Sequence, residues 1–112
     1  MAVPGGFREA PAEAARAFRA AMNALARPGR IETVGGAVPP APLSVAAGVL
    51  LLTLVDADTP LHLAGGADRP EVRDWLAFHA AAPLVGPGAA AFAVGRWAAL
   101  QPVGRFPQGL PD

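Results

Sequence analysis

A near-apolar run at residues 45–55, "VAAGVLLLTLV", constrains this chain more than any other feature of its sequence. The run is too short to cross a bilayer, which needs about 20 apolar residues, so it must be buried within the protein. Its length and its alanines favour a helix, with a buried strand as the alternative. Ser44 precedes the run and is the side chain expected to cap that helix.

Charge and residue usage exclude several classes of function. Nine acidic and nine basic residues balance to zero net charge, so the chain lacks the basic surface of a nucleic-acid-binding protein. All the basic residues are arginine, and without lysine the chain cannot form a Schiff base with pyridoxal phosphate. The absence of cysteine excludes disulfides and thiolate sites. The start lacks the apolar core of a signal peptide, so we expect a soluble cytoplasmic protein with no membrane partner.

The order of predicted elements indicates an α/β fold. The chain is long enough for one domain, residues 1–112, and its 13 glycines and 13 prolines predict short elements. Helices are predicted at residues 11–26, 44–55 and 68–80, and strands at residues 30–34, 60–65, 82–86 and 90–95. Such an alternating order places helices against a sheet.

The two amphipathic helices have patterns that predict which side faces the core. In the helix at 11–26, the residues at i, i+4 and i+7 that should be buried are Phe18, Met22 and Leu25. Asp68 should cap the helix at 68–80, with Pro70 in its first turn. The inner face of this helix is marked either by Val72, Leu76 and His79 or by Trp75, Phe78 and His79.

Two acids and a histidine follow the apolar run and suggest a site. Asp56 and Asp58 would share one face of a strand, where paired carboxylates bind a metal or share a proton. His62 would be a further ligand. The alternative is a helix end followed by a turn, in which Asp58 accepts backbone N–H groups ahead of Pro60. The turn is favoured because a metal needs more ligands than one nearby histidine supplies.

The remaining polar groups have structural explanations beside functional ones. His79 should lie near a helix C-terminus, where its imidazole interacts with the exposed carbonyls. Ser44 is the only serine and is needed as a cap, so no serine nucleophile with histidine and aspartate is assigned. Four arginines could grip a phosphate or a partner's carboxylates, or form a solvated helix face: Arg16, Arg19, Arg27 and Arg30. No catalytic, cofactor-binding or metal-binding residue is therefore assigned.

Four separated motifs together resemble the PhnH family, the H subunit of the bacterial carbon–phosphorus lyase system of phosphonate degradation. They are "FRAAMNALARPG" (18–29), "LLTLVDADTP" (51–60), "LAFHAAAPLV" (76–85) and "AAFAV" (90–94). The resemblance rests on their order and spacing, and it covers roughly residues 14–94.

The resemblance implies a fold and a role. The fold would be a three-layer α/β/α sandwich similar to pyridoxal-phosphate-dependent transferases, without the cofactor. Family members are longer, so we expect residues 1–112 to be an N-terminal part of such a domain.

The implied protein is a homodimer that joins subunits G, I and J in a core complex. As alpha-D-ribose 1-methylphosphonate 5-triphosphate synthase, this complex attaches a phosphonate to the ribose of ATP and releases adenine. The H subunit would be non-catalytic. The alternative hypothesis is a stand-alone phosphonate- or nucleotide-binding protein or enzyme that uses Asp56, Asp58 and His62 with the arginine-rich helix.

Overall fold

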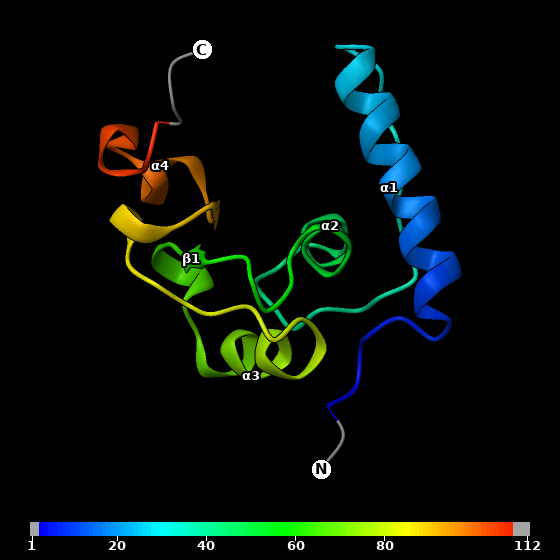
Figure 1. Cartoon of the computed structure of the whole chain (residues 1–112), viewed down its shortest axis with the longest axis horizontal. Helices are drawn as coiled ribbons and strands as arrows, with labels where there is room; N and C mark the ends of the chain where they lie inside the picture. Colours follow the sequence, from blue (N-terminus) through cyan, green and yellow to red (C-terminus); the bar gives the residue numbers. More distant parts are fainter. Residues whose placement is uncertain (1–2, 109–112) are drawn as a thin grey trace.

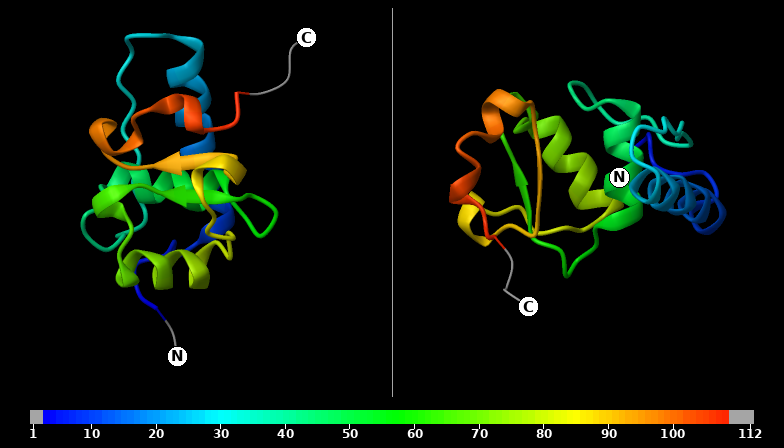
Figure 2. Two further views of the ribbon diagram at one scale, coloured as in Figure 1. Left: turned by 90° about the vertical axis from the view of Figure 1, so that its left-hand side faces the viewer. Right: turned by 90° about the horizontal axis from the view of Figure 1, so that it is seen from above.

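A computed structural model describes residues 3–108 of the chain. Its α-helices are α1 (Ala10–Ala26), α2 (Val45–Leu54), α3 (Pro70–His79) and α4 (Trp97–Leu100) (Figure 1). Within the same residues its strands are β1 (Leu61–Leu63) and β2 (Phe92–Val94), and its short 3-10 helices are η1 (Gly65–Ala67), η2 (Pro87–Ala89) and η3 (Val103–Arg105). The right-hand view of Figure 2 shows α1, α2 and α3 on one side of the strands and α4 on the other. This mixed arrangement confirms the predicted α/β class.

The apolar run forms α2, so the prediction of a helix rather than a strand is confirmed. The Ser44 hydroxyl accepts a hydrogen bond from the Ala47 N–H at 3.1 Å, which confirms its role as the cap. The buried residues of α2 are Gly48, Val49 and Leu51. Burial does not extend over the whole helix, because Val45 and Leu54 at its two ends are about half exposed. No helix among residues 3–108 is long and apolar enough to cross a membrane.

The strands form a small parallel sheet in which β1 is largely buried and β2 is largely exposed. β1 and β2 pair in the register Leu61↔Phe92, His62↔Ala93 and Leu63↔Val94. On the other side of β1, Leu61 donates to the Pro83 carbonyl and accepts from the Val85 N–H, both at 2.9 Å. The predicted strands at 60–65 and 90–95 are therefore present in shorter form, whereas residues 82–86 form a single bridge to β1.

The prediction of a strand at residues 30–34 is wrong. This segment runs back beside α1 as irregular chain (Figure 1). Arg30 and Glu32 form an ion pair along it at 3.4 Å. Its β-branched residues are typical of a strand, but among the described residues no strand lies beside it to complete a ladder.

The helix α3 packs on the sheet through the residues Val72, Trp75 and Leu76, all of them buried. The observed inner face therefore combines parts of the two predicted faces, and Phe78 is half exposed. Asp68 does not cap this helix, which corrects the prediction. Arg69 is the N-cap residue instead, and the Asp68 carboxylate binds the side chain of Arg73.

The predicted inner face of α1 points to solvent. Phe18 is 49% exposed, Met22 is 50% exposed and Leu25 is 78% exposed, whereas Ala17 is 3% exposed. The helix approaches α2 through small residues and projects beyond the rest of the molecule at its C-terminal end (Figure 1). Close approach of two helix backbones requires small side chains at the contact, and alanine meets that requirement where phenylalanine cannot.

Candidate functional site

The two acids after the apolar run form a turn. The Asp56 carboxylate accepts hydrogen bonds from the Asp58 N–H at 2.9 Å and from the Thr59 hydroxyl at 3.0 Å. The turn prediction is thus confirmed, but Asp56 is the acceptor, and the prediction that Asp58 plays this part is wrong. Within residues 3–108 no group of three histidines or acids is placed to hold a metal ion.

His62 lies on β1 and does not join the two acids. Its Nδ1 is 2.9 Å from the Val85 carbonyl oxygen, so that nitrogen carries the proton and donates. Its ring lies against Phe106, with the ring centroids 5.7 Å apart. His62 therefore links β1 to the neighbouring segment that contains Val85.

His79, the last residue of α3, contacts the beginning of the chain. Its Nε2 is 2.7 Å from the Val3 carbonyl oxygen, and its ring packs against Trp75 and Phe78. The predicted position at the C-terminal end of its helix is confirmed, but Nε2 binds a carbonyl of the N-terminal segment and not one of its own helix.

The four arginines named from the sequence are exposed along α1 and the segment after it. Arg30 is paired with Glu32, and Arg16 borders a 270 Å³ hollow shared with Glu13. The structure therefore places these arginines on the outer side of the molecule and does not gather them with Asp56 or His62.

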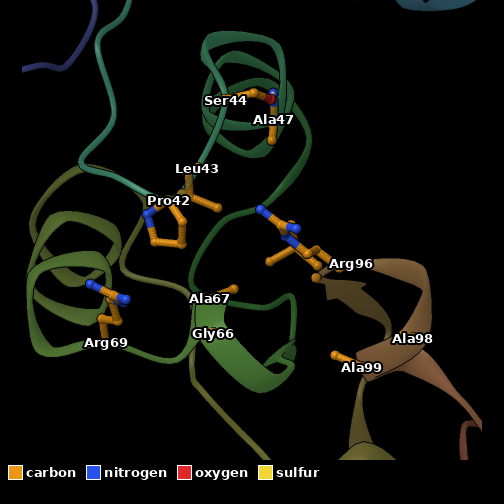
Figure 3. Close-up of a pocket in the computed structure, with 12 residues that line it drawn as sticks. Pro42, Leu43, Ser44, Ala47, Gly66, Ala67, Arg69, Arg96, Ala98 and Ala99 are labelled. Atoms are coloured by element: carbon orange, nitrogen blue, oxygen red, sulfur yellow. The ribbon is translucent and has the colours of Figure 1, made fainter.

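A larger cavity of about 460 Å³ lies between the start of α2, η1 and the connection from β2 to α4 (Figure 3). The charged side chains among its lining residues are Arg69 and Arg96, and no acid of the described chain lines it. The rest of the lining is small or apolar, with Leu43, Ala47 and Val94 as examples.

The two arginines reach the cavity because of local backbone geometry. A Cβ atom at Gly95 would lie 2.8 Å from the Ala64 Cβ, so glycine is needed where the end of β2 passes Ala64. This close approach brings the next residue, Arg96, to the cavity. Arg69 has an extended backbone directly before Pro70, which suits the first turn of α3.

The electrostatics of the cavity favour negative charge. Ser44, Arg69 and Arg96 line it, and they are the N-cap residues of α2, α3 and α4. The N-terminal end of a helix carries a partial positive charge, and α2 and α3 are long enough for this to count. Asp68, the neighbour of Arg69, is bound by Arg73 with Nη2 3.0 Å from Oδ2. This hydrogen bond lowers the pKa of Asp68 and keeps its carboxylate with Arg73.

Sequence reasoning missed Arg69 and Arg96. Each arginine stands at the boundary between a turn and a helix, and "RP" at 69–70 is a visible helix-start signal. The sequence around these two residues does not indicate that the two helix starts meet at one cavity. That information requires the path of β1, α3 and β2 in three dimensions.

Comparison with known proteins agrees with the motif series. The sequence matches the family model described as bacterial phosphonate metabolism protein (PhnH) over residues 5–112. It is 42% identical over 79 residues to alpha-D-ribose 1-methylphosphonate 5-triphosphate synthase subunit PhnH of Rhizobium meliloti (strain 1021). The alignment covers 70% of this chain and 40% of that relative, so the chain spans well under half of the relative's length. The family match over nearly the whole chain shows that this protein belongs to the PhnH family of bacterial phosphonate metabolism proteins.

Proposed function

We propose that this chain serves as the PhnH subunit of an alpha-D-ribose 1-methylphosphonate 5-triphosphate synthase. In the reaction that the resemblance implies, a phosphonate is attached to the ribose of ATP and adenine is released. The observation that carries the proposal is the 42% identity to a relative named as that subunit, together with the family match. A cytoplasmic location is part of the proposal, because ATP is a substrate of this reaction.

The proposed role is non-catalytic and depends on surfaces. We place the chain in a complex with subunits G, I and J, and as a homodimer. The exposed apolar residues of α1 support a role in assembly: Phe18, Met22 and Leu25. Large apolar side chains gathered on one projecting helix are typical of a surface that another protein covers.

Co-purification tests the proposed function. This chain would be co-expressed with tagged subunits G, I and J, and the Rhizobium meliloti relative would serve as the positive control. We expect the chain to elute with the tagged subunits. Met22→Glu should weaken this association, whereas Asn23→Glu, which adds the same charge at the next exposed position of α1, should not. A chain that never elutes with the subunits, while the relative does, would overturn the proposal.

We also propose that the fold is that of the three-layer α/β/α sandwich implied by the family resemblance. The helices on both sides of a parallel sheet support it (Figure 2). The alternative function, a stand-alone binder built on Asp56, Asp58 and His62, has no comparable support. The Asp56 carboxylate is occupied within its own turn, and His62 is bound to Val85.

A further inference from the structure

We propose that the cavity between the start of α2, η1 and α4 binds a small organic phosphate or phosphonate, with its anionic group held by Arg69 and Arg96. The cavity and its charge are properties of this chain's geometry. The choice of an organic phosphonate or nucleotide as ligand rests on the proposed function.

The charge of the cavity is the first part of the argument. Arg69 and Arg96 line it together, and neither makes a hydrogen bond or ion pair with a carboxylate of the described residues. The guanidinium of Arg96 extends from the end of β2 toward the start of α2, and Arg69 approaches from the start of α3 (Figure 3). Each guanidinium attracts an anion that enters the cavity, and no carboxylate among the lining residues competes with that anion. Guanidinium groups match the geometry of phosphate and phosphonate oxygens, to which they donate in pairs.

The lining of the cavity gives the second part of the argument. Its volume of about 460 Å³ exceeds the space that a lone phosphate needs and falls among the volumes usual for small-molecule sites. Away from the arginines the wall is apolar, made by side chains such as Leu43, Val94 and Ala99. Such a wall suits the organic part of a ligand whose charged group is elsewhere. The cavity therefore fits a molecule with one anionic end and one less polar end.

The N-terminal end of α2 adds to the preference of the cavity for an anionic ligand. Ser44 satisfies the Ala47 N–H, but other N–H groups of a first helical turn have no partner within the helix. The start of α2, where Ser44 and Ala47 line the cavity, thus adds partial positive charge to that of the arginines and would not suffice alone.

Isothermal titration of the whole chain tests the proposal. The titrants are methylphosphonate, ATP and inorganic phosphate, measured at low and high NaCl. We expect methylphosphonate or ATP to bind more tightly than inorganic phosphate, and binding to weaken with salt. Arg69→Gln and Arg96→Gln should each reduce affinity about tenfold or more, because each removes charge-assisted hydrogen bonds. Arg19→Gln on α1 removes the same charge far from the cavity and should leave affinity unchanged. Thermal melting of each variant would show that it is folded.

Several results would overturn the proposal. These are no binding of any titrant, equal weakening by Arg19→Gln, or unchanged affinity in the folded double variant of Arg69 and Arg96. Inorganic phosphate binding as tightly as the organic ligands would overturn the organic part of the assignment.

The co-purification assay separates this proposal from the proposed function. If the double variant still elutes with subunits G, I and J but has lost ligand binding, the cavity proposal is supported. If the unaltered chain elutes with the subunits and binds no titrant, the cavity proposal fails and the subunit role stands. If it binds ligand but never elutes with them, the subunit role fails and the cavity stands.

Discussion

Asp56 and Asp58 are the same residue type in nearly the same place, yet their carboxylates have different surroundings. Asp56 accepts from the Asp58 N–H and from the Thr59 hydroxyl, and the Thr59 hydroxyl in turn accepts from the Asp56 N–H at 3.2 Å. The Asp58 side chain makes no hydrogen bond among the described residues and is exposed. The carboxylate of an acid at the first position of a turn can accept from the N–H group two residues later. Asp56 holds that position, and Asp58 does not.

The two acids should therefore differ on substitution. Asp56→Ala should lower the free energy of unfolding by about 1 kcal/mol, as for a lost capping bond. Asp58→Ala should change it by less than about 0.5 kcal/mol. Urea denaturation followed by circular dichroism measures both. Asp56→Asn is the control, because its amide oxygen can still accept. Equal costs for the two alanine variants would contradict this account of the turn.

The pair of Asp68 and Arg73 gives a prediction for pH. Its hydrogen bond to Arg73 holds the pKa of Asp68 below its ordinary value. The pair thus stabilises the fold at pH values above about 3.9, the unfolded value, and this contribution is lost as the pH falls through the lower folded pKa. Both side chains are substantially exposed, so solvent screening keeps the effect small.

Melting temperature against pH measures the contribution of this pair. Asp68→Asn should melt at a lower temperature than the unaltered chain at pH 7, and the two curves should converge in strong acid. Asp74→Asn, next to Arg73 on α3, serves as the control, because Asp74 forms no ion pair within residues 3–108. A difference in melting temperature that grows as the pH falls would contradict a stabilising pair with a lowered carboxyl pKa.

At the scale of elements, α1 shows why an apolar period does not identify a buried face. Phe18, Met22 and Leu25 recur at helical spacing, and so do the alanines of the neighbouring face, of which Ala17 is buried. The contact with α2 selects the alanines, because they allow the two helices to lie close together. The size of the side chains, and not their hydrophobicity alone, determines which face of α1 is covered.

The apolar pattern of the sequence predicts that changing Phe18 destabilises the chain more than changing Ala17. The structure predicts the reverse order. Ala17→Leu should lower the free energy of unfolding by about 1–3 kcal/mol, because the added atoms must enter a site that is already packed. Phe18→Ser should lower it by less than Ala17→Leu in the chain alone, because about half of Phe18 is already exposed. Chemical denaturation of both variants measures the difference. A greater loss from Phe18→Ser would show that the aromatic ring is buried in solution.

At the scale of the whole molecule, contacts between distant segments hold the N-terminal residues against α3. His79 donates to the Val3 carbonyl, and the Val38 N–H donates to the Gly5 carbonyl at 2.8 Å. A Cβ atom at Gly5 would overlap the Val38 carbonyl oxygen, so the backbones touch directly. Residues 3–5 are thus part of the packed structure, attached at the end of α3.

His79→Ala should release this segment. We expect the Val38 amide to exchange with solvent at least about fivefold faster, because the lost hydrogen bond contributes about 1 kcal/mol. The Ala64 amide, bonded to Val94 at the end of the sheet, should be unaffected. Hydrogen exchange followed by NMR measures both amides. His79→Gln retains a donor and should restore part of the protection. Equal acceleration at Ala64 would indicate global destabilisation and would contradict a local attachment.

Local sequence chemistry was sufficient wherever neighbouring residues supply the interaction. The helix at α2, its Ser44 cap and the Asp56 turn all depend on hydrogen bonds between residues at most four apart, so the sequence predicts them. The family could also be predicted, because four motifs in order identify it without knowledge of the fold. The strand at 30–34 could not be corrected locally, because a strand exists only if a second segment pairs with it.

What the sequence determined by itself is therefore the identity of the family, the buried helix and the turn that follows it. Tertiary structure alone decided which face of α1 is covered and where the charged groups meet. Arg69 and Arg96 come from different helix starts, and only the parallel pairing of β1 with β2 brings both to one cavity. The physical reason is range: capping and turn bonds act between neighbours in the chain, whereas packing and cavity electrostatics depend on distances that the whole fold sets.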